Sequence, residues 1–286
     1  MDSSAQDFSS IKFSMAEQVA KRLQKIEGVI AITLGGSLAR NEGHTDSDID
    51  LGLYYDPQRL PSISDLNLLA AELDDSHSQN LITGFGEWGC WVNGGGWLTI
   101  NKQPVDWLYR DISLVFKVIE DCQLGKTSCH YYPGHPHGFH DYYYLSEIYY
   151  CRPLCDPKGI VTAFKQQVEH YPPLLKKAII EKYFWEASFS LKISSKSVKR
   201  EDIFYVTGCL FRSIACLTQV IFALNEKYFI NEKGSILIAS SLALCPKEFK
   251  NVVTSIMSHP GNNEPELLDQ INKLELLIED TKKFIK

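Results

Sequence analysis

The chain has no excess of basic residues. It contains 29 lysines and arginines against 35 aspartates and glutamates, a formal net charge of −6 at pH 7. A protein that binds a nucleic-acid duplex usually presents a basic face to the phosphates. We therefore expect no extended nucleic-acid partner.

The chain also lacks an apolar N-terminal segment and a regular cysteine pattern. Residues 1–4 are polar or acidic, unlike the start of a signal peptide. The eight cysteines are scattered without a standard zinc spacing, so we expect free thiols in a reducing cytoplasm. One apolar run, residues 203–224, is long enough to span a membrane. Its polar members, such as Gln219, favour a buried central helix of a bundle, and we expect no membrane partner.

Two patterns divide the chain near residue 111. Before it, short apolar or alternating segments indicate strands, and helical spacing appears at residues 6–27 and 63–75. The expected strands are 29–34, 48–55, 81–85, 90–92, 97–100 and 105–109. After it, helical patterns dominate. The sequence predicts an α/β (α+β) catalytic domain with a mixed sheet over residues 1–111, and an all-helical substrate-side domain over residues 112–286.

A glycine-serine turn and three aspartates carry the chemistry. Asp48 and Asp50 alternate with apolar residues, so both project from one face of a strand. Asp106 lies on a later strand among apolar neighbours. Mg²⁺ prefers carboxylate oxygens, and two such ions can hold the attacking and leaving oxygens of a phosphoryl transfer. Asp106 is either a third metal ligand or the base that takes the proton from the attacking hydroxyl.

Phosphate groups need a different kind of site. Gly36 and Ser37 begin a predicted helix, where backbone N–H groups can receive a phosphate. Arg40 lies one turn later and can add positive charge. Lys227, in a polar segment after the long apolar run, is a further candidate for the triphosphate.

These segments together resemble a known superfamily. Residues 36–40 (Gly-Ser-Leu-Ala-Arg), residues 46–51 (Asp-Ser-Asp-Ile-Asp-Leu) and the later Asp106 resemble the nucleotidyltransferases typified by DNA polymerase beta. The likeness is greatest to the small bacterial branch of minimal and aminoglycoside nucleotidyltransferases, although Asn41 stands where many members have glycine. The resemblance implies that Asp48, Asp50 and Asp106 bind two Mg²⁺ ions and are catalytic. It also implies that Gly36 and Ser37 contact the triphosphate.

The expected reaction moves a nucleoside monophosphate from an NTP, which we expect to be ATP, to an acceptor hydroxyl. Acidic residues such as Glu87 suit a cationic small molecule resembling an aminoglycoside. Two alternatives remain open. One is AMPylation of a protein or nucleotide addition to RNA, for which Lys176–Lys177 and residues 192–200 offer basic positions. The other is a nucleotide sensor or partner-binding module on an inactive fold. The acceptor, the nucleotide and the oligomeric state stay open.

Two arginines have two interpretations each. Arg110 either contacts phosphate or substrate, or forms a structural pair with a nearby acid. Arg212, inside the apolar run, either pairs with Asp202 or Glu186 or faces the substrate.

The segment 129–140 is rich in histidine, proline and glycine, and we expect a loop. In one interpretation the loop, which also carries His135, faces the substrate, and His137 and His140 contact it. In the other, the metal-capable residues of the loop bind structural zinc. Lys233 reaches the triphosphate or belongs to a solvated loop.

Overall fold

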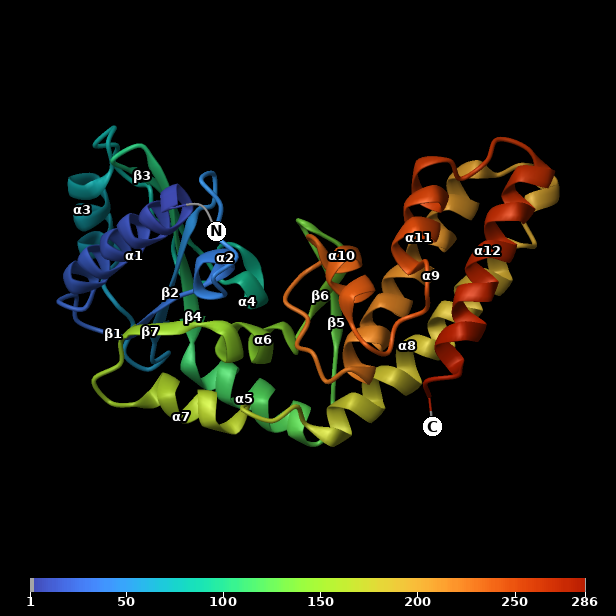
Figure 1. Ribbon diagram of the computed structural model, residues 1–286. Coiled ribbons are helices and arrows are strands. Elements are labelled where there is room, and N and C mark those ends of the chain that lie inside the picture. The colour runs from blue at the N-terminus through green and yellow to red at the C-terminus, as the bar shows by residue number, and fades with distance from the viewer. Residues whose placement is uncertain (1–2, 286) are drawn as a thin grey trace. The chain divides into compact units, whose positions relative to one another are not determined.

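The computed structural model of the protein describes residues 3–285 (Figure 1). The contacts divide the chain into two compact units. The sheet unit comprises Met1–Glu120 and Tyr144–His170, and the helical unit comprises Asp121–Tyr143 and Tyr171–Lys286. The contacts therefore do not separate at residue 111, where the sequence patterns change. The reason is that the chain leaves the sheet unit and then returns to it, which local pattern does not reveal.

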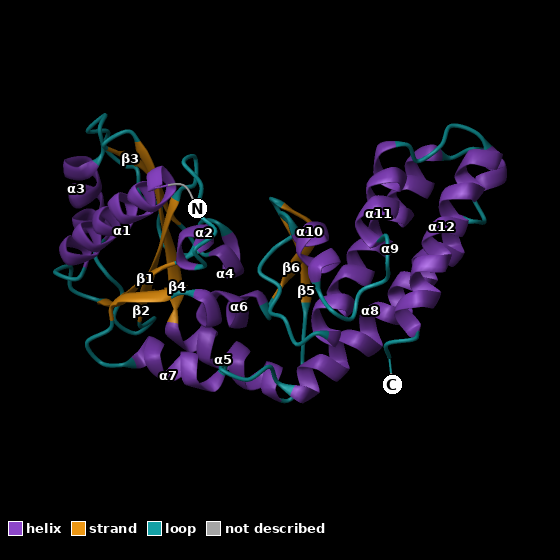
Figure 2. Cartoon of the chain, viewed as in Figure 1, coloured by secondary structure: helices purple, strands orange, loops and turns teal. Residues whose placement is uncertain are grey.

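The sheet unit is built on one five-stranded mixed sheet, as the sequence predicts (Figure 2). Its strand order is β3-β4-β2-β1-β7. The pair β2–β4 is parallel, and the other neighbouring pairs are antiparallel. The strands are β1 (Val29–Leu34), β2 (Ile49–Tyr55), β3 (Gly95–Ile100), β4 (Gln103–Asp111) and β7 (Arg152–Cys155). The short edge strand β7 was not predicted, because its four residues include a proline and do not alternate.

One face of this sheet packs against helices α1 (Ser3–Leu23) and α3 (Ile63–Leu73) (Figure 1). Alternate strand residues such as Leu51 and Trp107 are fully buried in this core. Burying one such side chain contributes about 2 kcal/mol to the hydrophobic stabilisation. Because strand side chains alternate, the residues between them project from the opposite face.

The remaining elements of the sheet unit correct two predicted strands. Residues 81–85 form no strand, and the Phe85 ring lies 4.5 Å from the Tyr55 ring and 4.4 Å from the Tyr109 ring. Residues 89–92 form a single helical turn, since a three-residue apolar run cannot distinguish helix from strand. The helices are α2 (Gly36–Ala39), α4 (Gly89–Val92), α5 (Ile112–Gln123), α6 (Tyr143–Tyr150) and α7 (Ile160–Gln167), of which α5 and α6 cross the division between the units.

The helical unit is helical from α8 onward, as predicted, but it also contains a β-hairpin. The segment expected as a loop forms β5 (Cys129–Tyr132) and β6 (His135–His140). Proline followed by Gly134, whose φ is +81°, is the sequence pattern of a type II turn and explains the hairpin. The helices are α8 (Pro173–Ser194), η1 (Val198–Arg200), α9 (Ile203–Leu224), α10 (Ser235–Ser241), α11 (Phe249–Ser258) and α12 (Glu264–Lys282).

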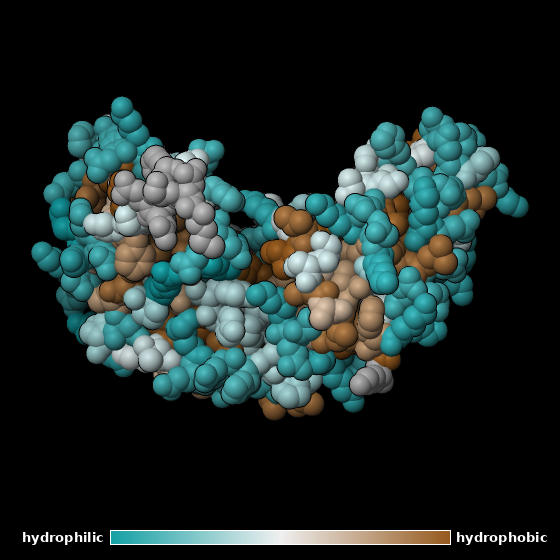
Figure 3. Space-filling view, viewed as in Figure 1, coloured by the Kyte–Doolittle hydropathy of each residue, from teal (hydrophilic) through white to brown (hydrophobic). Residues whose placement is uncertain are grey.

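Helix α9 is a core helix of this unit. It is long and apolar enough to cross a membrane, but 67% of its most apolar window is buried inside the protein. Its closest packing partner is α8, whose Ala187 carbonyl accepts a hydrogen bond from Ser213 Oγ at 2.8 Å. Hydrophilic residues cover much of the face seen in Figure 3. All eight cysteines are free thiols.

Candidate active site

The register of the parallel strands brings two of the predicted carboxylates together. Asp50 on β2 is the direct partner of Asp106 on β4. Adjacent strands lie about 4.8 Å apart, so the two side chains leave the sheet as neighbours on one face. Asp48 lies two residues before Asp50 and is exposed, while Asp50 and Asp106 are half-buried. Asp50 and Asp106 therefore share the face that α1 and α3 leave uncovered, and Asp48 lies directly before β2.

The glycine turn lies directly against Asp50. The Gly35 N–H donates to the Asp50 carbonyl at 2.8 Å. Gly36 has a φ of +62°, and a Cβ at this position would lie 1.8 Å from Asp50 Oδ2. Only glycine allows the turn to approach the carboxylate this closely. The start of α2 therefore lies in direct contact with Asp50.

A hydrogen-bond network fixes the segment between the turn and Asp48. Ser37 Oγ donates to Ser47 Oγ at 3.0 Å, and the His44 N–H donates to Ser47 Oγ at 2.8 Å. Gln103 Nε2 donates to the Ser47 carbonyl at 2.9 Å. Ser37 therefore has a structural contact in addition to its predicted contact with phosphate.

Lys12 on α1 is one of the residues that the sequence did not single out. Its side chain is buried, and Nζ donates to the Thr45 carbonyl at 2.7 Å and the Ser47 carbonyl at 2.6 Å. Burial lowers the pKa of Lys12, and the nearby charges of Asp46 and Asp48 oppose this shift. The ammonium group thus holds the segment that leads into Asp48.

We expect Lys12→Met to reduce the free energy of unfolding by about 2 kcal/mol, because it leaves partly buried carbonyls without a charged donor. We also expect weaker binding of divalent ions, since the segment before Asp48 loses its anchor. Urea denaturation and Mn²⁺ titration measure the two effects. Lys21→Met, an exposed position on the same helix, is the matched control. Equal results for the two variants would contradict this role.

The donor set suits magnesium in its chemistry. Asp48, Asp50 and Asp106 offer only carboxylate oxygens, which are the ligands that Mg²⁺ prefers. Between residues 3 and 285, no three His, Cys, Asp or Glu side chains are already gathered around one point. Carboxylates on one surface repel each other, and a cation removes that repulsion.

Comparison with known families agrees with this geometry. Residues 17–83, which include Gly36, Asp48 and Asp50, match the family described as polymerase beta, nucleotidyltransferase. The N-terminal part of the chain belongs to the nucleotidyltransferase superfamily. Residues 142–233 match a second family, described as a domain of unknown function (DUF4037).

A crystal structure of a nucleotidyltransferase-like protein from Exiguobacterium sibiricum aligns with 94% of this chain and 78% of that chain. The TM-score is 0.46 and the sequence identity is 9%, so the assignment rests on the family match. No curated protein matches the chain.

Two arginines lie at the C-terminal end of α2. Arg40 Nε pairs with Glu42 Oε2 at 2.7 Å, and 21% of the arginine side chain is exposed. Arg152 on β7 donates from Nε to the Ala39 carbonyl at 2.9 Å and also contacts the Asn41 side chain. Arg152 therefore fastens the end of α2 to the sheet edge. A phosphate contact by Arg40 stays a prediction.

Arg110 forms a structural pair with a nearby acid, which is the second of its two interpretations. Its buried guanidinium donates to Glu147 from Nε at 2.7 Å and from Nη2 at 2.8 Å, and Nη1 donates to the Tyr109 carbonyl. Burial opposes its charge, but the Glu147 carboxylate outweighs burial and raises the pKa of Arg110. The ion pair links β4 to α6, and these contacts leave no support for the phosphate interpretation.

The two predicted lysines lie in the helical unit. Lys227 is exposed just after α9, and Lys233 is exposed just before α10. The Lys233 N–H donates to Asn231 Oδ1 at 3.0 Å, which shapes a surface turn. The role of Lys227 in nucleotide binding stays a prediction.

Arg212 pairs with Glu186, one of the two partners that the sequence allowed. Its Nε donates to Glu186 Oε1 at 2.6 Å, and its Nη1 donates to the His137 carbonyl at 3.1 Å. The pair therefore joins α9 to α8 and to the hairpin.

His137 and His140 are buried, which corrects the expectation of a substrate-facing loop. His140 Nδ1 lies 2.8 Å from the Tyr183 hydroxyl, and its Nε2 lies 3.4 Å from His137 Nδ1. Neither histidine belongs to a group of three possible metal ligands within residues 3–285, so the structure gives no support for zinc. His135, nearer the turn, lies 3.4 Å from Glu232 Oε2.

These buried histidines make stability depend on pH. Burial, with the charge of Arg212, lowers the pKa of His137 to about 4, and burial lowers that of His140 well below 6.5. The unfolded chain therefore binds more protons than the folded one below pH 6.5, and stability falls as the pH falls. Between pH 6.5 and 4 we expect a loss of about 3 kcal/mol from His137.

Urea denaturation at pH 7, 5.5 and 4.5 measures this dependence. His137→Gln should flatten it, whereas His259→Gln, an exposed position, should leave it unchanged. An equally steep dependence in His137→Gln would contradict the assignment.

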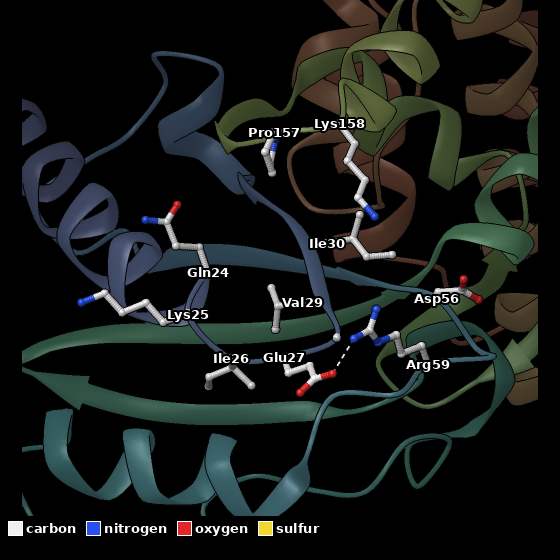
Figure 4. Close-up of a pocket in the computed structure, with 11 residues that line it drawn as sticks. Gln24, Lys25, Ile26, Glu27, Val29, Ile30, Asp56, Arg59, Pro157 and Lys158 are labelled. Atoms are coloured by element: carbon white, nitrogen blue, oxygen red, sulfur yellow. Dashed lines mark hydrogen bonds and ion pairs between the residues drawn. The ribbon is translucent and has the colours of Figure 1, made fainter.

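A cavity of about 360 Å³ lies at the other end of β1 and β2 (Figure 4). It is lined by the segment from Gln24 to Ile30 and by Asp56, Arg59, Pro157 and Lys158. The Arg59–Glu27 pair at its rim spans 2.5 Å. The aspartates lie at the start of β2 and the cavity at its end, so the length of the strand, about 20 Å, separates them. The candidate active site is the open face of the sheet.

Proposed function

We propose that the protein is a Mg²⁺-dependent nucleotidyltransferase that moves a nucleoside monophosphate, preferably AMP from ATP, to a hydroxyl of a small molecule. The observation that carries the proposal is the register of Asp50 with Asp106, together with Gly36 against the Asp50 carboxylate. In this arrangement the turn at Gly36, which we propose binds phosphate, directly contacts Asp50 of the carboxylate pair Asp50 and Asp106, with no side chain between the turn and Asp50.

Each residue has a defined task in the proposed reaction. Gly36 and Ser37 receive the triphosphate through the start of α2. Asp48 and Asp50, with Asp106, would hold two Mg²⁺ ions, which would neutralise phosphate charge and polarise the reacting oxygens. The acceptor oxygen forms a bond to the α-phosphorus, and the bond from that phosphorus to the bridging oxygen of the β-phosphate breaks. Pyrophosphate leaves, and in this proposal Asp106 takes the hydroxyl proton.

The acceptor is the finer part of the proposal. Asp50 and Asp106 on the sheet face, Asp48 directly before β2 and Glu87 in the loop before β3 make this part of the unit acidic, which favours a cationic compound such as an aminoglycoside-like antibiotic over a polyanion. Transfer to protein or RNA remains the alternative, and a nucleotide sensor is the non-enzymatic one. We place the activity in the cytoplasm, where eight free thiols are stable.

Transfer of label from α-labelled ATP, GTP, CTP and UTP tests the proposal. The acceptors are a panel of aminoglycosides and lincosamides and, separately, a cell lysate, with Asp48→Ala/Asp50→Ala as the control. Label on a small molecule that is absent with the control supports the proposal. Label on protein or RNA favours the alternative reaction. Nucleotide binding without any transfer favours the sensor.

A further inference from the structure

The row of residues that contains the aspartates continues to the edge of the sheet. In the antiparallel pair β3–β4, Trp97 is the direct partner of Asp106, which is itself the partner of Asp50. Direct partners project from the same face of a sheet. Trp97, Asp106 and Asp50 therefore stand side by side on three neighbouring strands, about 5 Å apart from one to the next.

Trp97 is exposed and yet held in one orientation. Its relative exposure is 65%, which is high for a tryptophan on a sheet. The ring of Trp88 stacks on it, with the centroids 4.4 Å apart and an interplanar angle of 20°. One face of the Trp97 indole is thus covered by Trp88, and the exposed remainder is available to a ligand.

Side chains of β2 and β4 hold the loop that contains Trp88. The Asn93 side chain accepts a hydrogen bond from the Gly86 N–H at 2.7 Å and donates to the Tyr55 hydroxyl at 2.5 Å. The Tyr109 hydroxyl donates to the Thr83 carbonyl at 3.0 Å. These contacts, with the packed Phe85 ring, fix the loop to β2 and β4. The stacked pair is therefore preorganised, which reduces the entropy lost on binding.

The order across the sheet gives the pair its place in the reaction. Gly36 lies against Asp50 on one side, and Trp97 lies beside Asp106 on the other. If the triphosphate occupies the Gly36 side, the acceptor hydroxyl approaches from the Asp106 side. Trp97 is the large exposed side chain next to that carboxylate.

We propose that Trp97, stacked on Trp88, is the platform that binds the acceptor of the nucleotidyl transfer, and that the acceptor is a ring-shaped polyol carrying protonated amines. An indole face attracts cations and packs against the C–H groups of a saturated ring. Asp106, the direct partner of Trp97, adds negative charge beside the rings, and the exposed Glu87 precedes Trp88 in the chain. Apolar faces bordered by carboxylates favour an amine-bearing ring over an acidic or purely apolar compound.

This inference rests on the proposed function, and its test separates the two. Isothermal calorimetry measures binding of Mg²⁺ with α,β-methylene-ATP, and then of kanamycin to that complex, with the uncharged ring myo-inositol for comparison. The proteins are the wild type, Trp97→Ala, Trp97→Phe and Asp50→Asn. Trp185→Ala is the matched control, because Trp185 is 63% exposed and stacked on Phe189 in the helical unit.

Trp97→Ala should weaken kanamycin binding about tenfold, the usual size of a cation–π and stacking contact. Trp97→Phe should retain most of the binding, and Trp185→Ala all of it. The affinity for the ATP analogue should be the same in every tryptophan variant, and myo-inositol should bind more weakly than kanamycin.

Three results would overturn the inference. Equal kanamycin affinity in Trp97→Ala would remove the platform. A wild-type complex that holds the analogue in an Asp50-dependent way but binds no kanamycin would remove the acceptor class alone. Analogue binding that does not depend on Asp50 would remove the proposed function on which the inference rests.

Discussion

Asp50→Asn should lower the rate of Mg²⁺-dependent nucleotidyl transfer at least about 10³-fold. Asp50 is the central carboxylate of the row, with Asp106 beside it across the parallel strands and Gly36 against its Oδ2 atom. An amide keeps the shape of the side chain but removes the charge that holds a divalent ion. Losing about 4 kcal/mol of transition-state stabilisation corresponds to this fall in rate.

The measurement is label transfer from α-labelled ATP to the best acceptor of the panel, with the melting temperature of each variant measured in parallel. Asp56→Asn is the matched control. Asp56 directly follows the same strand at its far end, where its Oδ1 accepts from the Gln58 N–H at 2.9 Å. A rate for Asp50→Asn within tenfold of the Asp56→Asn rate would show that Asp50 holds no catalytic metal.

Gly36→Ala should reduce the transfer rate about 100-fold. Its effect on the free energy of unfolding should be small. A Cβ at this position would lie 1.8 Å from Asp50 Oδ2, so the carboxylate or the turn must move. A displacement of about 1 Å in a site that works by positioning costs roughly two orders of magnitude in rate. The positive φ of 62° adds about 1 kcal/mol of backbone strain.

Gly159→Ala separates strain from displacement. Gly159 lies in the sheet unit with a φ of +67°, and a Cβ there meets no atom within 4 Å. The two variants should therefore lose similar stability in urea denaturation, while only Gly36→Ala loses activity. Full activity in Gly36→Ala would show that the contact between the turn and Asp50 has no part in the reaction.

The part of the site that the sequence predicted is local. Asp48 and Asp50 follow from alternation within one strand, and Gly36 and Ser37 from a turn after a buried run. Asp106 followed from its residue type and apolar neighbours, but its position beside Asp50 depends on strand register. Register is set by long-range pairing, which no single segment encodes.

The parts that the sequence missed are tertiary. Lys12 gains its role only when α1 packs beside the segment before Asp48, and nothing in the spacing of α1 distinguishes it. Trp97 was part of a predicted strand, but its place beside Asp106 again required the register. The predicted strand at residues 90–92 became helical, because so short an apolar run carries no period. The hairpin at 129–140 did have a signal, its proline-glycine turn, which the prediction of a loop passed over.

The most direct test of the account is electron paramagnetic resonance of Mn²⁺, in place of Mg²⁺, with ATP and either the wild type or Asp50→Asn. It needs no knowledge of the acceptor. The account predicts ATP-dependent Mn²⁺ binding in the wild type and in Asp56→Asn, and its loss in Asp50→Asn at unchanged melting temperature. Equal Mn²⁺ binding in all three proteins would contradict a catalytic metal site on the aspartate face of the sheet.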